Sequence, residues 1–230
     1  MTAQVVVRPR SAIRAVIFDL WNTLAEWPDA EWSEVRRGFA GRLGLTPDEF
    51  DQRWYGEVAE AREMGSLADA LAHFDASADV VAELVGARHA VTRQALRPTA
   101  GAVETLAELR RRGFRIGLIT VCTDDVPALW PETAFHGLFD AEVFSCSVGL
   151  RKPDPRIYEL ALKQLGVKAR EAVFVGDGAN DELAGAERVG MTAVLLERST
   201  EESSWVGLRI RSLPELLPLL LRDVAERAMA

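Results

Sequence analysis

Acidic, hydroxyl and basic side chains stand at the ends of several short apolar runs in this sequence of 230 residues. These positions are Asp19 in VIFDLWNTL, Thr120 in IGLIT, Lys152 in GLRKPDPRIY, and Asp177 and Asp181 in VGDGANDELAGA. A carboxylate acts as a covalent catalyst on an anionic substrate only where an adjacent cation offsets their repulsion, and a lysine or a hard metal ion does this. Carboxylate oxygens are also the ligands that Mg²⁺ prefers. The residue types therefore suit a carboxylate nucleophile with a lysine and a magnesium ion beside it.

Each of these residues also has a purely structural interpretation when it is taken alone. A carboxylate after a strand, such as Asp19, is often a helix cap or a turn residue. Lys152 could be a surface lysine before a proline-rich turn, and Asp181 could lie in the first turn of a helix. Convergence of these side chains on one edge of a sheet would favour the chemical interpretation.

Apolar runs rich in Val, Ile and Phe alternate with helical patterns, which is typical of parallel strands joined by crossover helices. The predicted strands are residues 14–19, 115–120, 141–145, 172–176 and 192–196. Amphipathic segments that end near glycine cover residues 102–113, 156–166 and 182–190. Ligands in such sheets bind at the carboxyl ends of the strands, where the polar residues above are expected to meet.

Residues 20–114 separate the first two predicted strands, far more than a simple crossover needs. The pattern within this stretch is helical: Thr46 and Pro47 open one helix, Ser66 caps another, and Pro98 closes the block. We therefore predict an α/β protein in which a Rossmann-like parallel sheet forms a core domain of residues 1–27 and 98–230. Residues 28–97 are predicted to form a cap domain of four helices. The tail SLPELLPLLLRDVAERAM predicts a terminal amphipathic helix that packs on the core.

The composition excludes other classes of protein. A net charge of −8, with Lys and Arg scattered along the chain, opposes binding to a phosphate backbone, so no nucleic-acid partner is expected. No segment approaches the roughly 20 apolar residues that span a bilayer, so no membrane partner is expected. The first residues, MTAQVVVRPRS, lack the apolar run of a secretory signal, which predicts a cytoplasmic protein. It is expected to be a monomer or a homodimer.

The cysteines and histidines are assigned no part in the chemistry. Cys122 and Cys146 form no CxxC pair and have no nearby histidine, so they are expected to be free thiols. His73, His89 and His136 lie outside the segments quoted above, and packing or surface roles are expected for them.

In their order and spacing, the quoted segments resemble the four motifs of the haloacid dehalogenase superfamily over residues 13–217. The resemblance implies a hydrolase in which Asp19 attacks the substrate and forms an aspartyl intermediate. Thr120 would hold the transferring group and Lys152 would neutralise charge. Mg²⁺ is the implied cofactor, with these ligands: Asp19, Asp177, Asp181 and the backbone carbonyl of Trp21. The partner is expected to be a small, anionic substrate whose charge is met locally, because the field of the whole protein opposes it.

Position 21 departs from the phosphatases of the superfamily, which carry there an Asp that serves as general acid and base. The indole of Trp21 cannot transfer protons. A positioned acid or base contributes about 10² to 10⁴-fold in rate, most where the leaving group is poor. The sequence therefore favours a phosphatase-type hydrolase acting on a small phosphorylated metabolite or an acyl phosphate.

Two other interpretations stay open. Haloacid dehalogenases have an aromatic residue at the position of Trp21 and a tyrosine at that of Tyr158, and halide leaves without protonation. Asp177, which their fourth motif lacks, and Val121, where asparagine often follows the second motif, argue against this alternative. The other interpretation is a catalytically degenerate ligand-binding protein, since a fold does not guarantee turnover.

Overall fold

The computed structural model of the chain describes residues 13–198 and 204–221. Its parallel strands form one six-stranded sheet in the order β3-β2-β1-β4-β5-β6. The strands are β1 (Ala15–Phe18), β2 (Arg115–Thr120), β3 (Ala141–Phe144), β4 (Ala172–Gly176), β5 (Thr192–Leu196) and β6 (Leu208–Ile210). The predicted α/β class with a parallel sheet is confirmed, and β6 is an additional edge strand.

Strand β1 lies at the point where the strand order reverses. The chain first builds outward to β2 and β3, and then returns to the other side of β1 to add β4, β5 and β6. Phe18 pairs in register with Leu118 of β2 and with Val175 of β4. Such a reversal leaves a crevice at the carboxyl ends of β1 and β4, and ligands bind in crevices of this kind in open α/β sheets. Asp19 and Asp177 follow these two strands directly.

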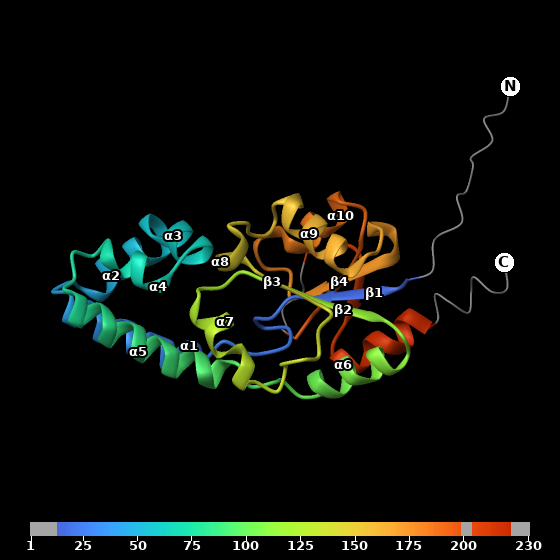
Figure 1. Ribbon diagram of the computed structural model, residues 1–230, viewed down its shortest axis with the longest axis horizontal. Coiled ribbons are helices and arrows are strands. Elements are labelled where there is room, and N and C mark those ends of the chain that lie inside the picture. Colours follow the sequence, from blue (N-terminus) through green and yellow to red (C-terminus); the bar gives the residue numbers. More distant parts are fainter. Residues whose placement is uncertain (1–12, 199–203, 222–230) are drawn as a thin grey trace, which may run out of the picture.

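Helices cover both faces of the sheet (Figure 1). One face packs on α9 (Pro155–Leu165) and α10 (Glu182–Arg188), and the other on α6 (Ala102–Arg111) and the segment that begins with the 3₁₀ turn η5 (Leu213–Glu215). Residues 216–221 are helical, and Leu213, Leu216 and Leu220 are buried, so the predicted terminal helix is confirmed up to residue 221; its remainder lies outside the described residues. Short helices complete the core: α7 (Asp125–Leu129), η2 (Trp130–Glu132), α8 (Ser145–Val148), η3 (Ala169–Glu171) and η4 (Ala179–Asp181).

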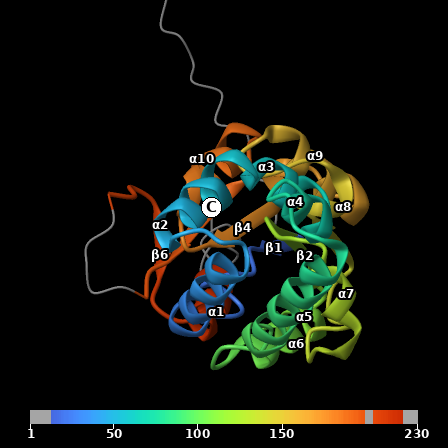
Figure 2. The same cartoon turned by 90° about the vertical axis from the view of Figure 1, so that its left-hand side faces the viewer.

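Between β1 and β2 the chain forms a separate group of helices, which we call the helical insertion (residues 28–97; left in Figure 1). It contains α1 (Asp29–Arg42), α2 (Pro47–Gln52), the π-helical η1 (Arg53–Glu57), α3 (Ala59–Met64), α4 (Leu67–Ala72) and α5 (Ala78–Ala95). It has five α-helices where the sequence predicts four, because the π-helical turn separates α2 from α3. In Figure 2 helices α2, α3 and α4 lie above α1 and α5.

Local sequence explains how the insertion forms. Thr46 and Glu49 make a reciprocal capping box at the start of α2, and Ser66 Oγ accepts a hydrogen bond from the Asp69 amide at 2.9 Å at the start of α4. Both predicted caps are confirmed. The aromatic core of the insertion consists of Trp32, Phe39, Phe50, Trp54 and Phe74. In the described part of the chain, no helix has the length and apolar character needed to cross a membrane.

Candidate active site

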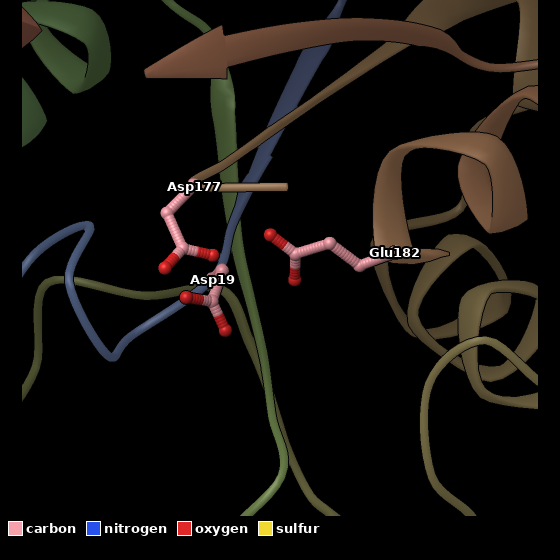
Figure 3. Close-up of side chains that lie close together, drawn as sticks. All are labelled: Asp19, Asp177 and Glu182. Carbon is pink, nitrogen blue, oxygen red and sulfur yellow. The ribbon is translucent and has the colours of Figure 1, made fainter. Parts of the chain in front are cut away.

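Three carboxylates meet at the carboxyl edge of the sheet (Figure 3). Asp19 follows β1, Asp177 follows β4, and Glu182 begins α10. One carboxylate oxygen of each lies within 4.8 Å of those of the other two. Asp19 and Glu182 are buried and Asp177 is half-buried. The two strands that flank the topological reversal therefore deliver their first polar residues to one place.

Backbone hydrogen bonds fix these groups. The Asp19 amide donates to the Val175 carbonyl at 2.9 Å, which continues the pairing of β1 with β4 by one residue. After β4 the chain turns tightly, and the Gly178 amide donates to the Glu182 carboxylate at 3.1 Å. Gly176 allows this approach, because a Cβ at that position would lie 2.0 Å from Oε1 of Glu182.

Lys152 lies between two of the carboxylates. Its Nζ donates to Oδ1 of Asp19 and to Oε2 of Glu182, and its side chain is 5% exposed. The ammonium also lies 5.4 Å from the centre of the Phe174 ring. One cation therefore serves a group of three carboxylates, which leaves the cluster with an excess of negative charge.

The ionisation of the cluster reflects this imbalance. Burial raises the pKa of the Asp19 carboxyl above its ordinary value, although Lys152 acts in the opposite direction. Burial likewise raises the pKa of Glu182, to about 8, against the attraction of Lys152. Burial lowers the pKa of Lys152, but its carboxylate neighbours outweigh this and the pKa is raised overall. A single lysine does not offset the desolvation of both carboxylates, so a further positive charge would stabilise their ionised forms.

A cavity of about 450 Å³ opens above the cluster. Its floor includes Asp19, Lys152 and Asp177, and its core wall includes Cys122 and Thr123 from the loop after β2. The helical insertion supplies much of the opposite wall, with these residues: Trp32, Trp54, Tyr55, Arg62, Glu63 and Arg88. The volume is within the range of about 300 to 1,000 Å³ that is typical of small-molecule sites.

Residues 13–190 match the family of haloacid dehalogenase-like (HAD-like) hydrolases. The chain belongs to this family. A glyceraldehyde 3-phosphate phosphatase of Methanopyrus kandleri is 34% identical over 203 residues, which cover 81% of this chain and 84% of that protein. The membership predicted from the four motifs is confirmed.

Solved structures of both chemical types resemble this HAD-like chain. The crystal structure of a HAD phosphatase from Thermococcus onnurineus superposes with a TM-score of 0.72 at 25% identity, covering 90% of this chain and 98% of that one. A 2-haloacid dehalogenase from Pseudomonas syringae gives 0.71 at 26% identity, covering 91% and 99%. These likenesses support the HAD-like fold and do not by themselves separate the two activities.

The structure brings together Asp19, Lys152 and Asp177 as the sequence predicts, but it does not bring Asp181 to them. Asp181 is exposed, and the acidic group contains Glu182 in its place. Asn180 and Asp181 both have left-handed backbone angles, with φ of 51° and 55°, and this turn presents the second of two adjacent acidic residues to the site. One feature of the sequence points to Glu182: it stands four residues before Ala186, and two residues at this spacing lie on the same face of a helix. Ala186 is buried, so this face is directed into the protein.

Thr120 ends β2 and is fully buried. Its hydroxyl makes no hydrogen bond to any described residue, and the same is true of Thr23 after β1. Among the described residues, those that line the cavity next to Thr120 are Val121, Cys122 and Thr123. A buried hydroxyl without a partner costs about 1 to 3 kcal/mol, so Thr120 holds an unused hydrogen-bonding group at the carboxyl edge of the sheet.

The aromatic residues Trp21 and Tyr158, which bear on the choice between phosphatase and dehalogenase chemistry, differ in their surroundings. Trp21 is half-buried in the cavity wall, with its ring edge-on to Trp27 at a centroid distance of 4.9 Å. Tyr158 is buried, and its hydroxyl donates to the backbone carbonyl of Glu182 at 2.8 Å. Tyr158 therefore holds the start of α10 in place, a structural task that accounts for its hydroxyl.

The cysteines are free thiols. Cys122 is buried in the cavity wall and Cys146 is half-buried, and their sulfur atoms are 3.8 Å apart. His73 and His136 are exposed and His89 is half-buried. Among the described residues that line the cavity there is no histidine.

Proposed function

We propose that this HAD-like hydrolase is a phosphatase-type enzyme with Asp19 as its nucleophile and Mg²⁺ as its cofactor. The observation that carries the proposal is the buried contact of Lys152 with Asp19 and Glu182, beside Asp177. A lysine in this place favours the ionised form of Asp19, which a nucleophilic carboxylate requires, and a metal ion beside it would favour that form further. The phosphatase name of the 34% identical relative supports the same chemistry.

The donor set fits Mg²⁺. The three carboxylates provide hard oxygen atoms within 4.8 Å of one another, and a divalent cation would offset their excess negative charge. We propose Asp19, Asp177 and Glu182 as the side chains that hold the ion, with Glu182 in the place that the sequence assigns to Asp181. The backbone carbonyl of Trp21 stays a predicted ligand. When bound, the ion supplies charge neutralisation and polarisation of a phosphoryl oxygen.

The roles of the side chains follow from their positions. A carboxylate oxygen of Asp19 forms a bond to phosphorus while the bond from phosphorus to the leaving oxygen breaks, and water later hydrolyses the aspartyl phosphate. Lys152 orients Asp19 and offsets the phosphoryl charge. The unused hydroxyl of Thr120 is proposed to hold the transferring group. Trp21 offers no proton to the leaving oxygen, so activated substrates such as acyl phosphates, or small phosphorylated metabolites that supply their own proton, suit the site best.

The helical insertion is proposed to act as a cap domain over the core domain of residues 1–27 and 98–230. Its own aromatic core and its share of the cavity wall support this division. A cytoplasmic location and a monomeric or homodimeric state, expected from the sequence, stay predictions.

Dehalogenation is the second candidate, and the aromatic Trp21 and the 26% identical dehalogenase structure favour it. Two observations weigh against it. Asp177 places a third acidic group beside Asp19, which an attack on carbon does not need, and Tyr158 is engaged with the backbone of Glu182. A degenerate binding protein is the third candidate, against which the intact Asp19 and Lys152 pair argues.

The deciding experiment compares Asp19→Asn with Asp181→Asn on a panel of acyl phosphates, phosphomonoesters and 2-haloacids, with and without MgCl₂. Asp19→Asn is expected to abolish turnover with the fold intact, whereas exposed Asp181, whose left-handed backbone asparagine tolerates, is the matched control. Phosphate release that survives in Asp19→Asn would refute the nucleophile. Halide release without metal would establish the second candidate, and no release of either product would establish the third.

A further inference from the structure

Guanidinium groups line the side of the cavity that the helical insertion forms. The core side carries the acidic cluster with a single ammonium. The insertion side carries the guanidinium groups of Arg62 on α3 and Arg88 on α5, together with the carboxylates of Asp29 and Glu63. The side chains of Arg62 and Arg88 are 13% and 8% exposed, so Arg88 is buried and Arg62 is open to solvent only in small part. A cavity that binds only a phosphate at Asp19 has no need of guanidinium groups in the wall that the insertion forms.

The charge of Arg88 is neutralised within the protein. Its Nε donates to the Asp125 carboxylate at 3.2 Å, and Asp125 is fully buried. The guanidinium also lies over the rings of Trp27, at 4.2 Å, and Trp32, at 4.4 Å. Arg88 is therefore a structural cation whose carboxylate partner neutralises it.

Arg62 is not satisfied in this way. Its Nη2 donates to Glu63 at 2.8 Å, but the same carboxylate accepts from Arg151 at 3.0 Å, so one acid serves two guanidinium groups. The Nε of Arg62 is buried and has no hydrogen-bond partner within the described parts of the chain. A buried donor of a charged group is costly to leave unpaired. The arrangement therefore leaves excess positive charge and a free donor beside the cavity.

The position of Arg62 is fixed by its neighbours. The guanidinium lies 5.1 Å from the centre of the Trp54 ring. The backbone carbonyl of Glu63 accepts a hydrogen bond from Ser145 Oγ at 2.5 Å, which ties α3 to the core. A guanidinium held by a ring and by an anchored neighbour loses little conformational freedom when it binds an anion, and its planar fork suits carboxylate and phosphate oxygens.

We infer that Arg62 binds a second anionic group of the substrate, a carboxylate or a further phosphate, while the group to be transferred lies at Asp19. This rests on the proposed phosphatase function and names the class of substrate: a compound with an anionic group at each end. Arg62 is then a specificity-determining residue of the insertion, and the acidic cluster and Arg62 select the two ends of one molecule.

The test uses phosphonates, which bind without being hydrolysed. Calorimetry in the presence of MgCl₂ compares 2-carboxyethylphosphonate and ethane-1,2-diphosphonate with ethylphosphonate, which lacks the second anionic group. The wild-type protein is expected to bind the first or the second probe about 10 to 100 times more tightly than ethylphosphonate, the gain of a charged hydrogen bond. Arg62→Met is expected to remove this preference, and Arg62→Lys to retain part of it.

Arg53→Met is the matched control. Arg53 also stacks on a ring, that of Phe74 at 4.4 Å, and pairs with a glutamate, Glu57 at 3.3 Å, but it is not among the residues that line the cavity. The Arg53→Met variant is expected to keep the preference for probes with two anionic groups over ethylphosphonate. Equal binding of all three probes by the wild-type protein, no binding of any, or a preference that survives in Arg62→Met would overturn the inference. The proposed function is judged separately by Asp19→Asn turnover, so the two can fail independently.

Discussion

Arg88 and Asp125 form a buried ion pair, with Nε and Oδ2 3.2 Å apart, across the junction between the helical insertion and the core. The Asp125 carboxylate also accepts hydrogen bonds from the hydroxyls of Thr92 on α5 and Thr123 on the loop before α7. Every oxygen of this buried acid therefore has a partner. Because the partners come from both parts of the molecule, the network sets how the insertion lies on the core.

Asp125→Ala is expected to destabilise the protein by about 3 to 5 kcal/mol, because it leaves the Arg88 cation buried without its counter-charge. Glu132→Ala is the control. Glu132 pairs with Arg93, which lies on α5 as Arg88 does, but the side chains of Glu132 and Arg93 are 58% and 57% exposed. A loss of stability of about 0 to 1 kcal/mol is therefore expected. Urea denaturation of the two variants measures the difference. Equal losses would mean that the buried pair has no special part in holding the insertion.

The metal site gives a second prediction. Glu182→Gln and Asp177→Asn are each expected to weaken Mg²⁺ binding by at least about tenfold, since loss of even an outer-shell partner costs that much. Asp181→Asn is expected to leave the affinity unchanged, because Asp181 is exposed and lies outside the acidic group. Titration calorimetry with MgCl₂ measures all three. Weakened binding in Asp177→Asn and Asp181→Asn, with the affinity of Glu182→Gln unchanged, would restore the ligand set that the sequence predicts.

The two thiols should differ in reactivity. Burial raises the pKa of Cys122 well above its ordinary value, whereas the hydrogen bond from Cys122 lowers that of Cys146. The thiolate is the reacting form, so near pH 8 iodoacetamide is expected to label half-buried Cys146 first. Peptide mass spectrometry over time measures the order, and Cys146→Ser is the control, in which labelling at Cys122 should stay slow. Faster labelling of Cys122 than of Cys146 would contradict the described environment of the pair.

The sheet could be predicted from the sequence because buried parallel strands are continuous apolar runs. These runs predict β1 to β5 to within one residue of their observed ends. β6 escapes this signal, since only Ile210 of its three residues is buried. The break between α2 and α3 escapes as well, because the π-helical turn at Arg53–Glu57 lies within a stretch that is helical on both sides.

The catalytic edge could be predicted only in part. Asp19, Lys152 and Asp177 follow from strand ends. The choice of Glu182 over Asp181 depends on the left-handed backbone of Asn180 and Asp181, a conformation that these residue types permit but do not require. Arg62 lies far from the motifs in sequence. It reaches the cavity because the insertion packs on the loops after β2 and β3, through contacts such as that of the Leu67 amide with Asp124 at 2.8 Å. Such long-range packing leaves no local pattern.

Trp21 offers a direct test of the chemistry. Its side chain lies in the cavity wall two residues beyond Asp19 and cannot protonate an alkoxide leaving group. Trp21→Asp is expected to raise the hydrolysis of alkyl phosphates by up to about 10²-fold, because it places a carboxylic acid near the leaving oxygen. Acetyl phosphate, whose leaving group needs little protonation, should gain far less. The measurement is kcat/KM for both substrate types, taken as a ratio, because a smaller side chain also changes binding.

The matched control for this prediction is Trp21→Asn, which has nearly the same size and polarity as the aspartate variant but no acid. It opens the cavity and removes the ring contact with Trp27 to the same extent. A gain on alkyl phosphates that is found with aspartate and absent with asparagine identifies proton transfer as the missing element. If the two variants change both substrate types equally, Trp21 acts through shape and the exclusion of water, and the proton for the leaving group comes from the substrate itself or from the helical insertion.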